Sequence, residues 1–441
     1  MNMNLWDALG KHLNAVQLKL IGQVSDAAGR LGMPVYIVGG VVRDLLLDRP
    51  VKDLDIVVGG DAICLGREVV SAYGGSLLTH PQFFTANWES EEDAIPDIPI
   101  AGWGPRASLD LISARSETYP SPAALPVVTM GSIEDDLHRR DFTVNTLAVR
   151  LDGEHRGGLL DLCGGLRDLN AGILRTLHDR SFVDDPTRIF RGIRFEQRFG
   201  FAFEPDTLRQ MREQMDGIAD LTGPRIWHEL RLFCSEPCPE KLFSRIAGLG
   251  IAERIHSGLA WTETVEADCL RFRTGVPGRK PLFPGGGPDM EIVDEEGLLW
   301  VWFSALPRDM VTELGKRLQL SGRTIEGIEN TALMREKFPA FADRKTSEAF
   351  FFLDKIPLPA LYCYSRICTS EKEWDLMRDY LDQWDQSSPV TTGHDLRRMG
   401  FEPGPKIGEI LKRLRAARID GEVRTEQEEA ALLERIRQEE E

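Results

Sequence analysis

Two aspartates, Asp53 and Asp55, are separated by one residue in the apolar stretch "DLDIVV". On a β-strand, residues i and i+2 point to the same face, about 6.5 to 7 Å apart. Two carboxylates this close repel each other unless cations lie between them. Such a pair could hold two Mg²⁺ ions about 4 Å apart, which is the arrangement that clamps the attacking and leaving oxygens of a phosphoryl displacement. The alternative is a strand edge that leads into a turn, with both carboxylates in solvent.

A candidate phosphate-binding element precedes the two aspartates. The segment "YIVGGVVRDLLL" is typical of a strand that ends in Gly39 and Gly40, followed by a helix that opens near Val41. Glycines let backbone N–H groups approach a phosphate, and a helix N-terminus favours an anion. Arg43, in the first helical turn, can add a forked contact to a triphosphate. A Gly-Gly pair is only a tight turn in most proteins, but here the pair, the arginine and both aspartates fall within seventeen residues.

A second set of charged residues lies on a helix that is predicted to begin near Asp185. Asp185 followed by Pro186 is the pairing of N-cap and first-turn residue that begins many helices. Arginines then recur at spacings of three, three and four, which places them within roughly 120° of one another. A charged stripe is usually a solvated face, but arginine without lysine suits forked contacts to phosphates or base edges. The four arginines are Arg188, Arg191, Arg194 and Arg198.

The elements around these residues indicate an α/β head. Pro34–Val38, Leu54–Val58 and Ser108–Ala114 are rich in Val and Ile or alternate apolar with polar residues, as strands do. Leu5–Met33 has the apolar spacing of an amphipathic helix. From about Leu159 onward apolar residues recur at three and four, which predicts an almost wholly helical remainder.

These patterns predict three parts. We expect a head over 1–155, a helical neck over 156–272 that carries the Asp185 helix, and a helical body and tail over 290–441. The segment Thr274–Asp289 is dense in Pro and Gly, so we expect a linker or inserted loop there.

Composition limits the class of protein. The chain has 441 residues, long enough for two or three domains. Its longest strongly apolar run, Gly297–Leu306, is far shorter than the roughly 20 residues that span a bilayer, so we expect a core segment there and no membrane association. The seven cysteines are odd in number and lack paired spacing, which indicates free thiols in a reducing compartment. With no secretory signal at the N-terminus, we expect a cytoplasmic protein.

The net charge of −17 is unusual for a nucleic-acid-binding protein, because neutralising phosphates needs Lys and Arg. A global sum is a weak guide where basic residues cluster locally. Between Asp395 and Arg418 basic residues outnumber acidic ones, which predicts a patch that follows a phosphate backbone. The candidate RNA-binding residues there are Arg397, Arg398, Lys406, Lys412 and Arg413.

Several ordered motifs together resemble one family. "GGVVRDLLL" followed by "DLDIVV" is similar to the signature of the polymerase-beta-like nucleotidyltransferases, specifically the class II tRNA nucleotidyltransferase (CCA-, CC- or A-adding enzyme) and bacterial poly(A) polymerase family. "EDDLHRRDFTVNTLAV", "DDPTRIFRGIRFEQRFGF" and "TTGHDLRRMGFEPGPKIGEILKRL" resemble its second motif, its nucleotide-recognition helix and its tRNA-binding tail. The resemblance is strong from Pro34 to about Leu230, clear after Thr391, and thin between.

The resemblance implies a fold and an activity. The fold is a polymerase-beta-like nucleotidyltransferase head with a small mixed sheet, followed by an all-α neck, body and tail. The activity is addition of C and/or A from CTP and/or ATP to the tRNA 3′ end, with two Mg²⁺ ions. Asp53 and Asp55 hold the metals in this interpretation. A third acidic residue is implied on a neighbouring strand, and Asp110 in "SLDLISARSE" could either join the metal site or merely edge the sheet.

The resemblance also assigns nucleotide-binding roles. Gly39, Gly40 and Arg43 bind the triphosphate, and Asp185 and Arg188 pair with the incoming base. Cytosine and adenine each show an amino donor beside a ring-nitrogen acceptor, which a carboxylate and a guanidinium can satisfy. The residues implied in support are Arg140, Arg191 and Arg194. For Arg140 a salt bridge to Asp141 or another carboxylate is the alternative.

Two positions depart from the family pattern. Asp184 replaces the commoner Glu and is expected to steady Arg188, whereas Gly192 replaces the commoner Ala and is expected to loosen the helix. The segment "SETYPSPAALPVVTMGSI" has no Lys or Arg and three prolines, unlike the polar, flexible loop typical of full CCA-adding relatives. We therefore favour a partial enzyme, CC- or A-adding. The alternatives are a full CCA-adding enzyme, a poly(A) polymerase, or an inactive RNA-binding module.

Overall fold

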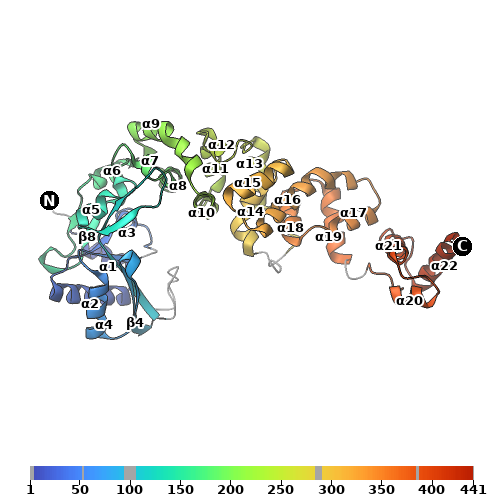
Figure 1. Cartoon of the computed structure of the whole chain (residues 1–441), viewed down its shortest axis with the longest axis horizontal. Helices are drawn as coiled ribbons and strands as arrows, with labels where there is room; N and C mark the ends of the chain where they lie inside the picture. The colour runs from blue at the N-terminus through green and yellow to red at the C-terminus, as the bar shows by residue number, and fades with distance from the viewer. Residues whose placement is uncertain (1–3, 52–53, 94–105, 284–290, 384–386, 441) are drawn as a thin grey trace. The chain divides into compact units, whose positions relative to one another are not determined.

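The computed structural model describes residues 4–51, 54–93, 106–283, 291–383 and 387–440 (Figure 1). The chain forms two compact units, Met1–Leu221 and Thr222–Glu441. The first contains all the strands of the described residues, and the second is helical throughout its described part.

The first unit is built on a seven-stranded sheet in the order β3-β4-β5-β2-β1-β8-β9. Strands β2 and β5 run parallel and the other neighbours run antiparallel, so the prediction of a small mixed sheet is confirmed. The strands are β1 (Val35–Val38), β2 (Asp55–Val58), β3 (Ser76–His80), β4 (Thr85–Asp93), β5 (Arg106–Ser113), β8 (Ala148–Arg150) and β9 (Leu159–Leu160).

The two faces of this sheet have different surroundings. Ile56 on β2 lies in the same cross-strand row as Ala86 on β4, on the face that α4 (Ala62–Tyr73) covers. Val57 points to the opposite face, into a core that includes residues of α5 (Ile133–His138). Because side chains alternate along a strand, Asp55 shares the face of Val57.

The N-terminal segment Leu5–Met33 is two helices, so the prediction of one helix is wrong. Helix α1 (Trp6–His12) ends before Leu13, and α2 (Ala15–Leu31) begins after Asn14. The Asn14 side chain accepts from the Gln17 backbone N–H while the Gln17 side chain accepts from the Asn14 N–H. This reciprocal capping box satisfies free backbone donors at a new helix start, which explains the break.

The neck part of the first unit is helical except for short strands. An aromatic cluster holds it to the head, because Phe142 packs against Phe182, Phe195 and Phe203 with ring centroids 6.1–6.5 Å apart. The remaining elements of the head are α3 (Gly40–Leu46) and the hairpin of β6 (Arg115–Thr118) and β7 (Val127–Met130). Those of the neck are α6 (Gly165–Ala171), β10 (Ile173–Leu174), α7 (Ser181–Asp184), α8 (Thr187–Phe199), β11 (Ala202–Phe203) and α9 (Pro205–Gln214).

The second unit packs helices around apolar stripes. Trp300 and Trp302 of α14 are buried, so the predicted core segment at Gly297–Leu306 is confirmed. Thr274 ends α13, and 284–289 of the expected linker lie outside the described residues. The helices are α10 (Gly223–Cys234), α11 (Pro239–Gly248), α12 (Ile251–Ile255), α13 (Glu263–Thr274), α14 (Glu291–Phe303), α15 (Arg308–Leu318), α16 (Gly322–Lys337), α17 (Thr346–Leu353), α18 (Leu358–Ile367), α19 (Glu371–Gln383), α20 (Gly393–Arg398), α21 (Pro405–Ile419) and α22 (Glu426–Glu440).

All seven cysteines are free thiols, as the sequence predicted. Among the helices described, none combines the length and the apolar character that a membrane span requires.

Candidate active site

Two carboxylates lie side by side on the sheet. Asp55 is the first residue of β2, and its Cα partner on the parallel strand β5 is Asp110. Directly paired residues of neighbouring strands share a face, so both carboxylates lie on the face of Val57. Both residues are exposed. The structure thus brings Asp110 next to Asp55, whereas Asp53 lies outside the described residues.

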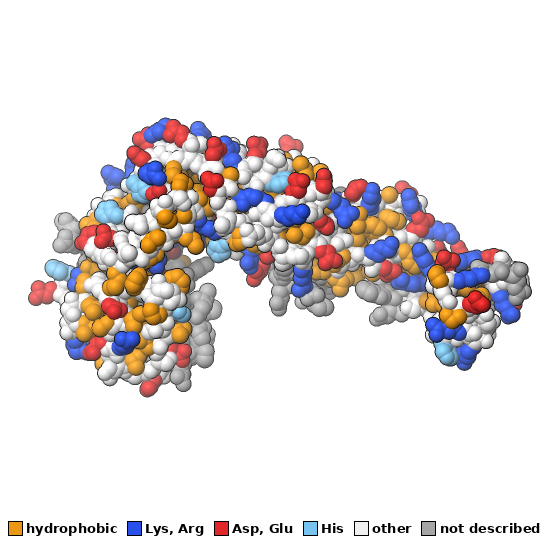
Figure 2. All heavy atoms as spheres, viewed as in Figure 1, with side chains coloured by type: hydrophobic (Ala, Val, Ile, Leu, Met, Phe, Trp, Pro, Cys, Tyr) orange, Lys and Arg blue, Asp and Glu red, His pale blue; other side chains and the backbone are white. Residues whose placement is uncertain are grey.

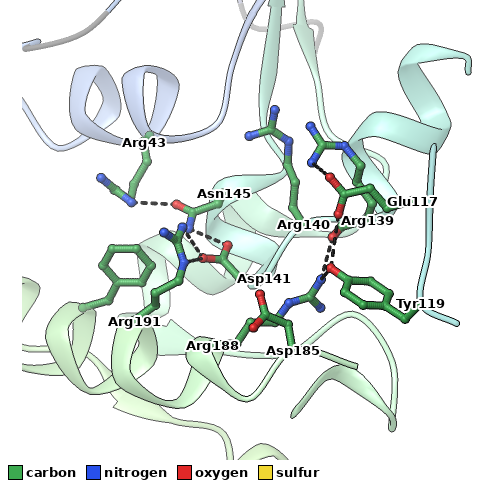
Figure 3. A pocket seen from close by; sticks show the side chains of 12 residues that line it. Arg43, Glu117, Tyr119, Arg139, Arg140, Asp141, Asn145, Asp185, Arg188 and Arg191 are labelled. Atoms are coloured by element: carbon green, nitrogen blue, oxygen red, sulfur yellow. Dashed lines mark hydrogen bonds and ion pairs between the residues drawn. The ribbon is translucent and has the colours of Figure 1, made fainter. Parts of the chain in front are cut away.

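Two adjoining cavities, of 400 and 360 Å³, lie on this part of the first unit. We name the first the carboxylate cavity, because Asp55 lines it, and the second the arginine cavity, which reaches α8 (Figure 3). Residues that line both are Gly40, Arg43, Arg139 and Arg140. The carboxylate cavity adds Asp44, Arg115 and Arg198, and the arginine cavity adds Glu117, Tyr119, Asp141, Asn145, Asp185, Arg188 and Arg191.

Arg43 is buried between the two cavities. Its Nη1 donates to Asn145 Oδ1 at 2.6 Å, and its Nη2 lies 2.8 Å from Asp44 Oδ1. The guanidinium also lies over the ring of Phe199, 4.4 Å from the centroid. Burial lowers the pKa of Arg43, while Asp44 opposes this change. These contacts fix the orientation of the side chain, and its contact to a triphosphate stays a prediction.

Arg140 forms a salt bridge, one of the two alternatives that the sequence left open, and its contact with nucleotide stays a prediction. Its Nη2 lies 2.8 Å from Asp136 Oδ2, so the salt bridge exists, but its partner is Asp136 and not Asp141. The same guanidinium lines both cavities. A Cβ added to Gly39, whose φ is +72°, would lie 2.4 Å from Arg140 Nη1. Glycine at this position therefore serves both the backbone turn and the close approach of Arg140.

Asp141 is the buried centre of the arginine cavity. Its Oδ1 accepts from the Phe142 N–H and from Asn145 Nδ2, both at 2.8 Å, and its Oδ2 lies 2.7 Å from Arg191 Nη2. Burial alone would raise the pKa of Asp141, but Arg191 and these donors together hold that pKa well below its usual range. A chain of contacts thus runs from Arg43 through Asn145 and Asp141 to Arg191 (Figure 3).

Asp141→Asn is expected to lower the free energy of unfolding at pH 7 by about 2 kcal/mol, the worth of hydrogen bonds to a buried charge. The carboxyl of an unfolded chain titrates near pH 3.9, and the folded pKa lies lower. The stabilisation is therefore fully present above about pH 4 and is lost as the pH falls through the folded value. Urea denaturation of both proteins should give a constant difference from about pH 5 to 8 that shrinks below about pH 4.

The matched control for this measurement is Asp206→Asn, because Asp206 is an exposed carboxylate that pairs with Arg209 on the surface of α9. This change should alter the unfolding free energy by no more than about 0.5 kcal/mol. A difference between native and Asp141→Asn protein that persists unchanged at pH 3 would contradict the assignment.

Asp185 and Arg188 lie at the start of α8, on the wall of the arginine cavity (Figure 3). The N-cap of α8 is Pro186, so the prediction of Asp185 as N-cap is wrong by one residue, but Asp185 Oδ1 still accepts from the Thr187 N–H at 3.0 Å and from Thr187 Oγ1 at 2.6 Å. Arg188 is only 4% exposed. Its Nη1 donates to Ser181 Oγ at 2.7 Å, and its Nη2 donates to the Arg139 carbonyl at 2.8 Å. Arg188 Nη2 also lies 3.4 Å from the Tyr119 hydroxyl.

The four arginines of α8 do not form one exposed face, so that prediction is wrong. Arg188 and Arg194 are buried, and Arg194 lines neither cavity. Arg191 lines the arginine cavity, whereas Arg198 is exposed and lines the carboxylate cavity. Helix α8 packs between the head and the other neck elements. The residue pattern of a single helix cannot show which of its side chains such packing buries.

The structure shows the surroundings of the two sequence departures. Asp184 lies 3.5 Å from Arg180, its ion-pair partner, and its effect on Arg188 stays a prediction. At Gly192 an added Cβ would lie 2.7 Å from Phe142 Cζ and 2.8 Å from the Phe203 ring. The absent side chain lets the aromatic cluster pack closely against α8, and the expected loosening of the helix stays a prediction.

The site contains residues that sequence reasoning missed. Glu117 Oε1 lies 2.7 Å from Arg139 Nη1, and Tyr119 Oη donates to Glu117 Oε2 at 3.2 Å. Burial raises the pKa of Tyr119 to about 12, so its hydroxyl keeps its proton at neutral pH. Asn145 was also missed, whereas Arg139 and Asp141 belong to the core of the second motif but were given no role at the site. The segment "RRDFTVN" could have predicted these residues, because its charged and amide residues flank an apolar Phe142. Phe142 is buried, so the polar side chains beside it lie at the edge of the core.

The predicted RNA-binding residues lie on the last helices of the second unit. Leu396, Ile410 and Leu414 are buried in a small core of α20–α22, and the basic residues lie on exposed surface around it (Figure 2). Arg413 Nη2 lies 2.8 Å from Glu439, and Arg398 pairs with Asp395. Lys412 Nζ lies 4.9 Å from the centroid of the Phe351 ring, and Arg397 and Lys406 are exposed.

The carboxylate pair suits a hard divalent cation. Mg²⁺ is usually bound by one or two carboxylates together with water and substrate phosphates, which Asp55, Asp110 and an adjoining cavity can provide. Within the described ranges, which exclude Asp53, no group of three or more His, Cys, Asp or Glu side chains could hold a metal ion by itself.

Known proteins match this chain over nearly its whole length. Residues 35–175 match the poly A polymerase head domain, and residues 200–261 match the probable RNA and SrmB-binding site of polymerase A. The A-adding tRNA nucleotidyltransferase of Halalkalibacterium halodurans is 30% identical over 96% of this chain and 94% of its own. The CC-adding enzyme of Deinococcus radiodurans is 31% identical over 93% and 92%.

A solved structure extends this similarity to the fold. The CCA-adding enzyme of Thermotoga maritima complexed with tRNA is 27% identical, with a TM-score of 0.73 over 100% of this chain and 99% of that chain. The resemblance inferred from the motifs is therefore confirmed, and this chain belongs to the tRNA nucleotidyltransferase family.

Proposed function

We propose that this enzyme adds a single A, from ATP, to the 3′ end of a tRNA that already ends in CC. The observation that carries the proposal is that the two cavities adjoin and share lining residues. Arg43, Arg139 and Arg140 line both, so one ligand can extend from the carboxylates at Asp55 to the polar groups at Asp185 and Arg188. A nucleoside triphosphate has this layout, with an anionic end and a hydrogen-bonding base.

The reaction is an in-line displacement at the α-phosphate. The tRNA 3′-hydroxyl oxygen forms a bond to the α-phosphorus, and the bond from that phosphorus to the oxygen bridging the β-phosphate breaks. Pyrophosphate leaves, and Asp110 is placed to receive the hydroxyl proton or to orient the hydroxyl. Gly40, Arg43 and Arg140 hold the triphosphate, since they lie where the cavities meet. Charge neutralisation and positioning are the main contributions that such a site makes.

The site is proposed to use Mg²⁺. Asp55 and Asp53 would hold the metal, with Asp110 beside them on the neighbouring strand. When bound, two Mg²⁺ ions would neutralise the charge that develops on the attacking and leaving oxygens.

Base selection is assigned to Asp185 and Arg188. Asp185 Oδ1 accepts from Thr187 at the start of α8, and the carboxylate lines the arginine cavity, where it can accept from the amino group of adenine. Arg188 has five N–H donors, and the contacts to Ser181, Arg139 and Tyr119 use at most three of them. A remaining donor can reach a ring nitrogen. Arg191 supports this arrangement through Asp141, and Arg194 packs beside Phe195 within α8.

The loop after β6 supports a partial enzyme. The Ala123 N–H donates to the Val183 carbonyl at 3.2 Å, and Ala123 is buried. Together with the Tyr119 contact to Arg188, this bond ties the loop to the start of α8. A base-binding site that is held in one arrangement suits an enzyme that adds one kind of base. An enzyme that changes from C to A needs a site that can rearrange. An A-adding and a CC-adding relative both match nearly the whole chain, which supports a partial enzyme.

The tail is the proposed tRNA-binding part. Arg397, Arg398, Lys406, Lys412 and Arg413 present positive charge that suits a phosphate backbone. In this proposal the head, 1–155, carries catalysis, the neck, 156–272, carries base selection, and the body and tail, 290–441, hold the RNA. The free thiols favour a cytoplasmic location.

The decisive experiment offers tRNAs that lack one, two or three terminal nucleotides, with each nucleoside triphosphate separately and Mg²⁺ present. One A added to the tRNA ending in CC, with no use of CTP, is the expected result. Incorporation of CTP into the shorter tRNAs would assign a CC-adding or full CCA-adding enzyme. Long A tails on unrelated RNA would assign a poly(A) polymerase, and no incorporation at all would leave an RNA-binding module.

A further inference from the structure

The carboxylate pair has a polar neighbour on the third strand of the same row. Asn87 on β4 is the Cα partner of Asp110 on β5, and Asp110 is in turn the partner of Asp55 on β2. Since directly paired residues share a face, the three side chains lie in one line across three adjacent strands. The next residue in that line is Leu78 on the edge strand β3.

Asn87 contacts only one of the two oxygens of Asp110 in this arrangement. Its Nδ2 donates to Asp110 Oδ1 at 2.8 Å. Asn87 reaches Asp110 from the β4 side, whereas Asp55 lies on the β2 side of the same strand. The amide therefore limits the rotation of the carboxylate and leaves Oδ2 as the oxygen to act on the Asp55 side.

The residue type at this position suits such a role. A carboxylate in place of Asn87 would put a third negative charge beside Asp110 and repel it. An apolar side chain of similar size would leave Asp110 free to rotate. A neutral amide donor avoids both effects, and polar groups that orient ligating carboxylates act in the same way in metal sites generally.

We infer that Asn87 is a positioning residue that orients Asp110 toward the divalent cation and the attacking hydroxyl. This inference rests on the proposed function, because it presumes that Asp110 acts at the metal site. Asn87 itself touches neither nucleotide nor RNA in this scheme. Its effect should therefore be visible in metal binding before any turnover occurs.

The test measures the binding of Mn²⁺ alone to the full-length protein by electron paramagnetic resonance, with turnover as a second readout. Asn87→Leu is expected to weaken Mn²⁺ binding by about 10- to 100-fold and to lower kcat by a similar factor, since removing groups that orient metal ligands has effects of this size. KM for ATP should stay within about twofold, because the proposed triphosphate-binding residues are Gly40, Arg43 and Arg140, which line both cavities. Asn87→Gln keeps an amide donor on a longer arm and should fall between the native protein and Asn87→Leu.

Leu78→Ser is the matched control, since Leu78 lies in the same row and is 60% exposed but touches neither carboxylate. It should leave Mn²⁺ affinity unchanged. Circular dichroism checks that each variant is folded, and if Asn87→Leu does not fold, Asn87→Gln and Asn87→Ser carry the comparison.

A double-mutant cycle separates positioning from a general structural role. Asn87→Leu made in the Asp110→Asn protein should cause no further loss of Mn²⁺ affinity, because Asn87 acts through Asp110. A full additional loss would overturn the inference. If Asp110→Asn weakens binding but Asn87→Leu does not, the inference fails and the proposed function stands. If Asp110→Asn itself changes nothing, the proposed role of Asp110 fails, and the inference fails with it.

Discussion

Asp55→Asn is expected to lower kcat for nucleotide incorporation by about a thousandfold, the largest effect among the changes considered. The amide keeps the shape of the side chain and removes the charge that a divalent cation requires. Because Asp55 is exposed at the start of β2, the free energy of unfolding should change by no more than about 0.5 kcal/mol. Single-turnover incorporation of labelled ATP measures the effect.

The same protein should bind tRNA almost as tightly as the native enzyme. The proposed RNA-binding residues lie on α20 and α21 of the second unit, and Asp55 lies in the first. Filter binding with a tRNA ending in CC measures this affinity. Asp26→Asn is the matched control, because Asp26 is an exposed aspartate on α2 of the same unit. Turnover that survives in the Asp55→Asn protein would refute the metal assignment.

Asp185→Asn is expected to lower kcat/KM for ATP by about 10- to 100-fold, because a hydrogen bond to a charged group is lost from the base. The asparagine amide oxygen can accept the same bonds from Thr187, so α8 should keep its start and the protein its stability. The amide can turn its N–H toward the base, which suits the carbonyl groups of uracil or guanine. Discrimination against UTP should therefore decrease. Competition between ATP and UTP for the tRNA end measures this ratio.

Asp184→Asn is the control for that experiment. Asp184 precedes Asp185 directly, pairs with Arg180 and does not line the arginine cavity. Its replacement should leave the ratio of ATP to UTP incorporation unchanged. Unaltered selectivity in both proteins would show that Asp185 serves only the start of α8 and that base selection is made elsewhere.

Local patterns in the sequence were sufficient for the elements that carry the site. The strands at 35–38 and 55–58, the glycine turn at Gly39 and the start of α8 just after Asp185 all follow from contacts between residues a few positions apart. Ordered motifs then indicated the family, because each combines residue types whose chemistry requires that spacing. The division of Leu5–Met33 at Asn14 also has a local cause, the capping box between Asn14 and Gln17, which apolar spacing alone does not show.

Contacts between distant residues depended on how the chain folds back on itself. Arg43 bonds to Asn145 across 102 positions and Asn87 bonds to Asp110 across 23, and the second pair follows from the register of β4 against β5. Whether an arginine of α8 is buried or exposed depends on the helices and aromatic rings packed around the helix. The close contact of Gly192 with Phe142 is one part of that packing. Residue types and their spacing thus determined which chemistry this chain can carry out. The packing of strands and helices from distant parts of the sequence determined which side chains meet to do it, because hydrogen bonds and burial depend on distance in space.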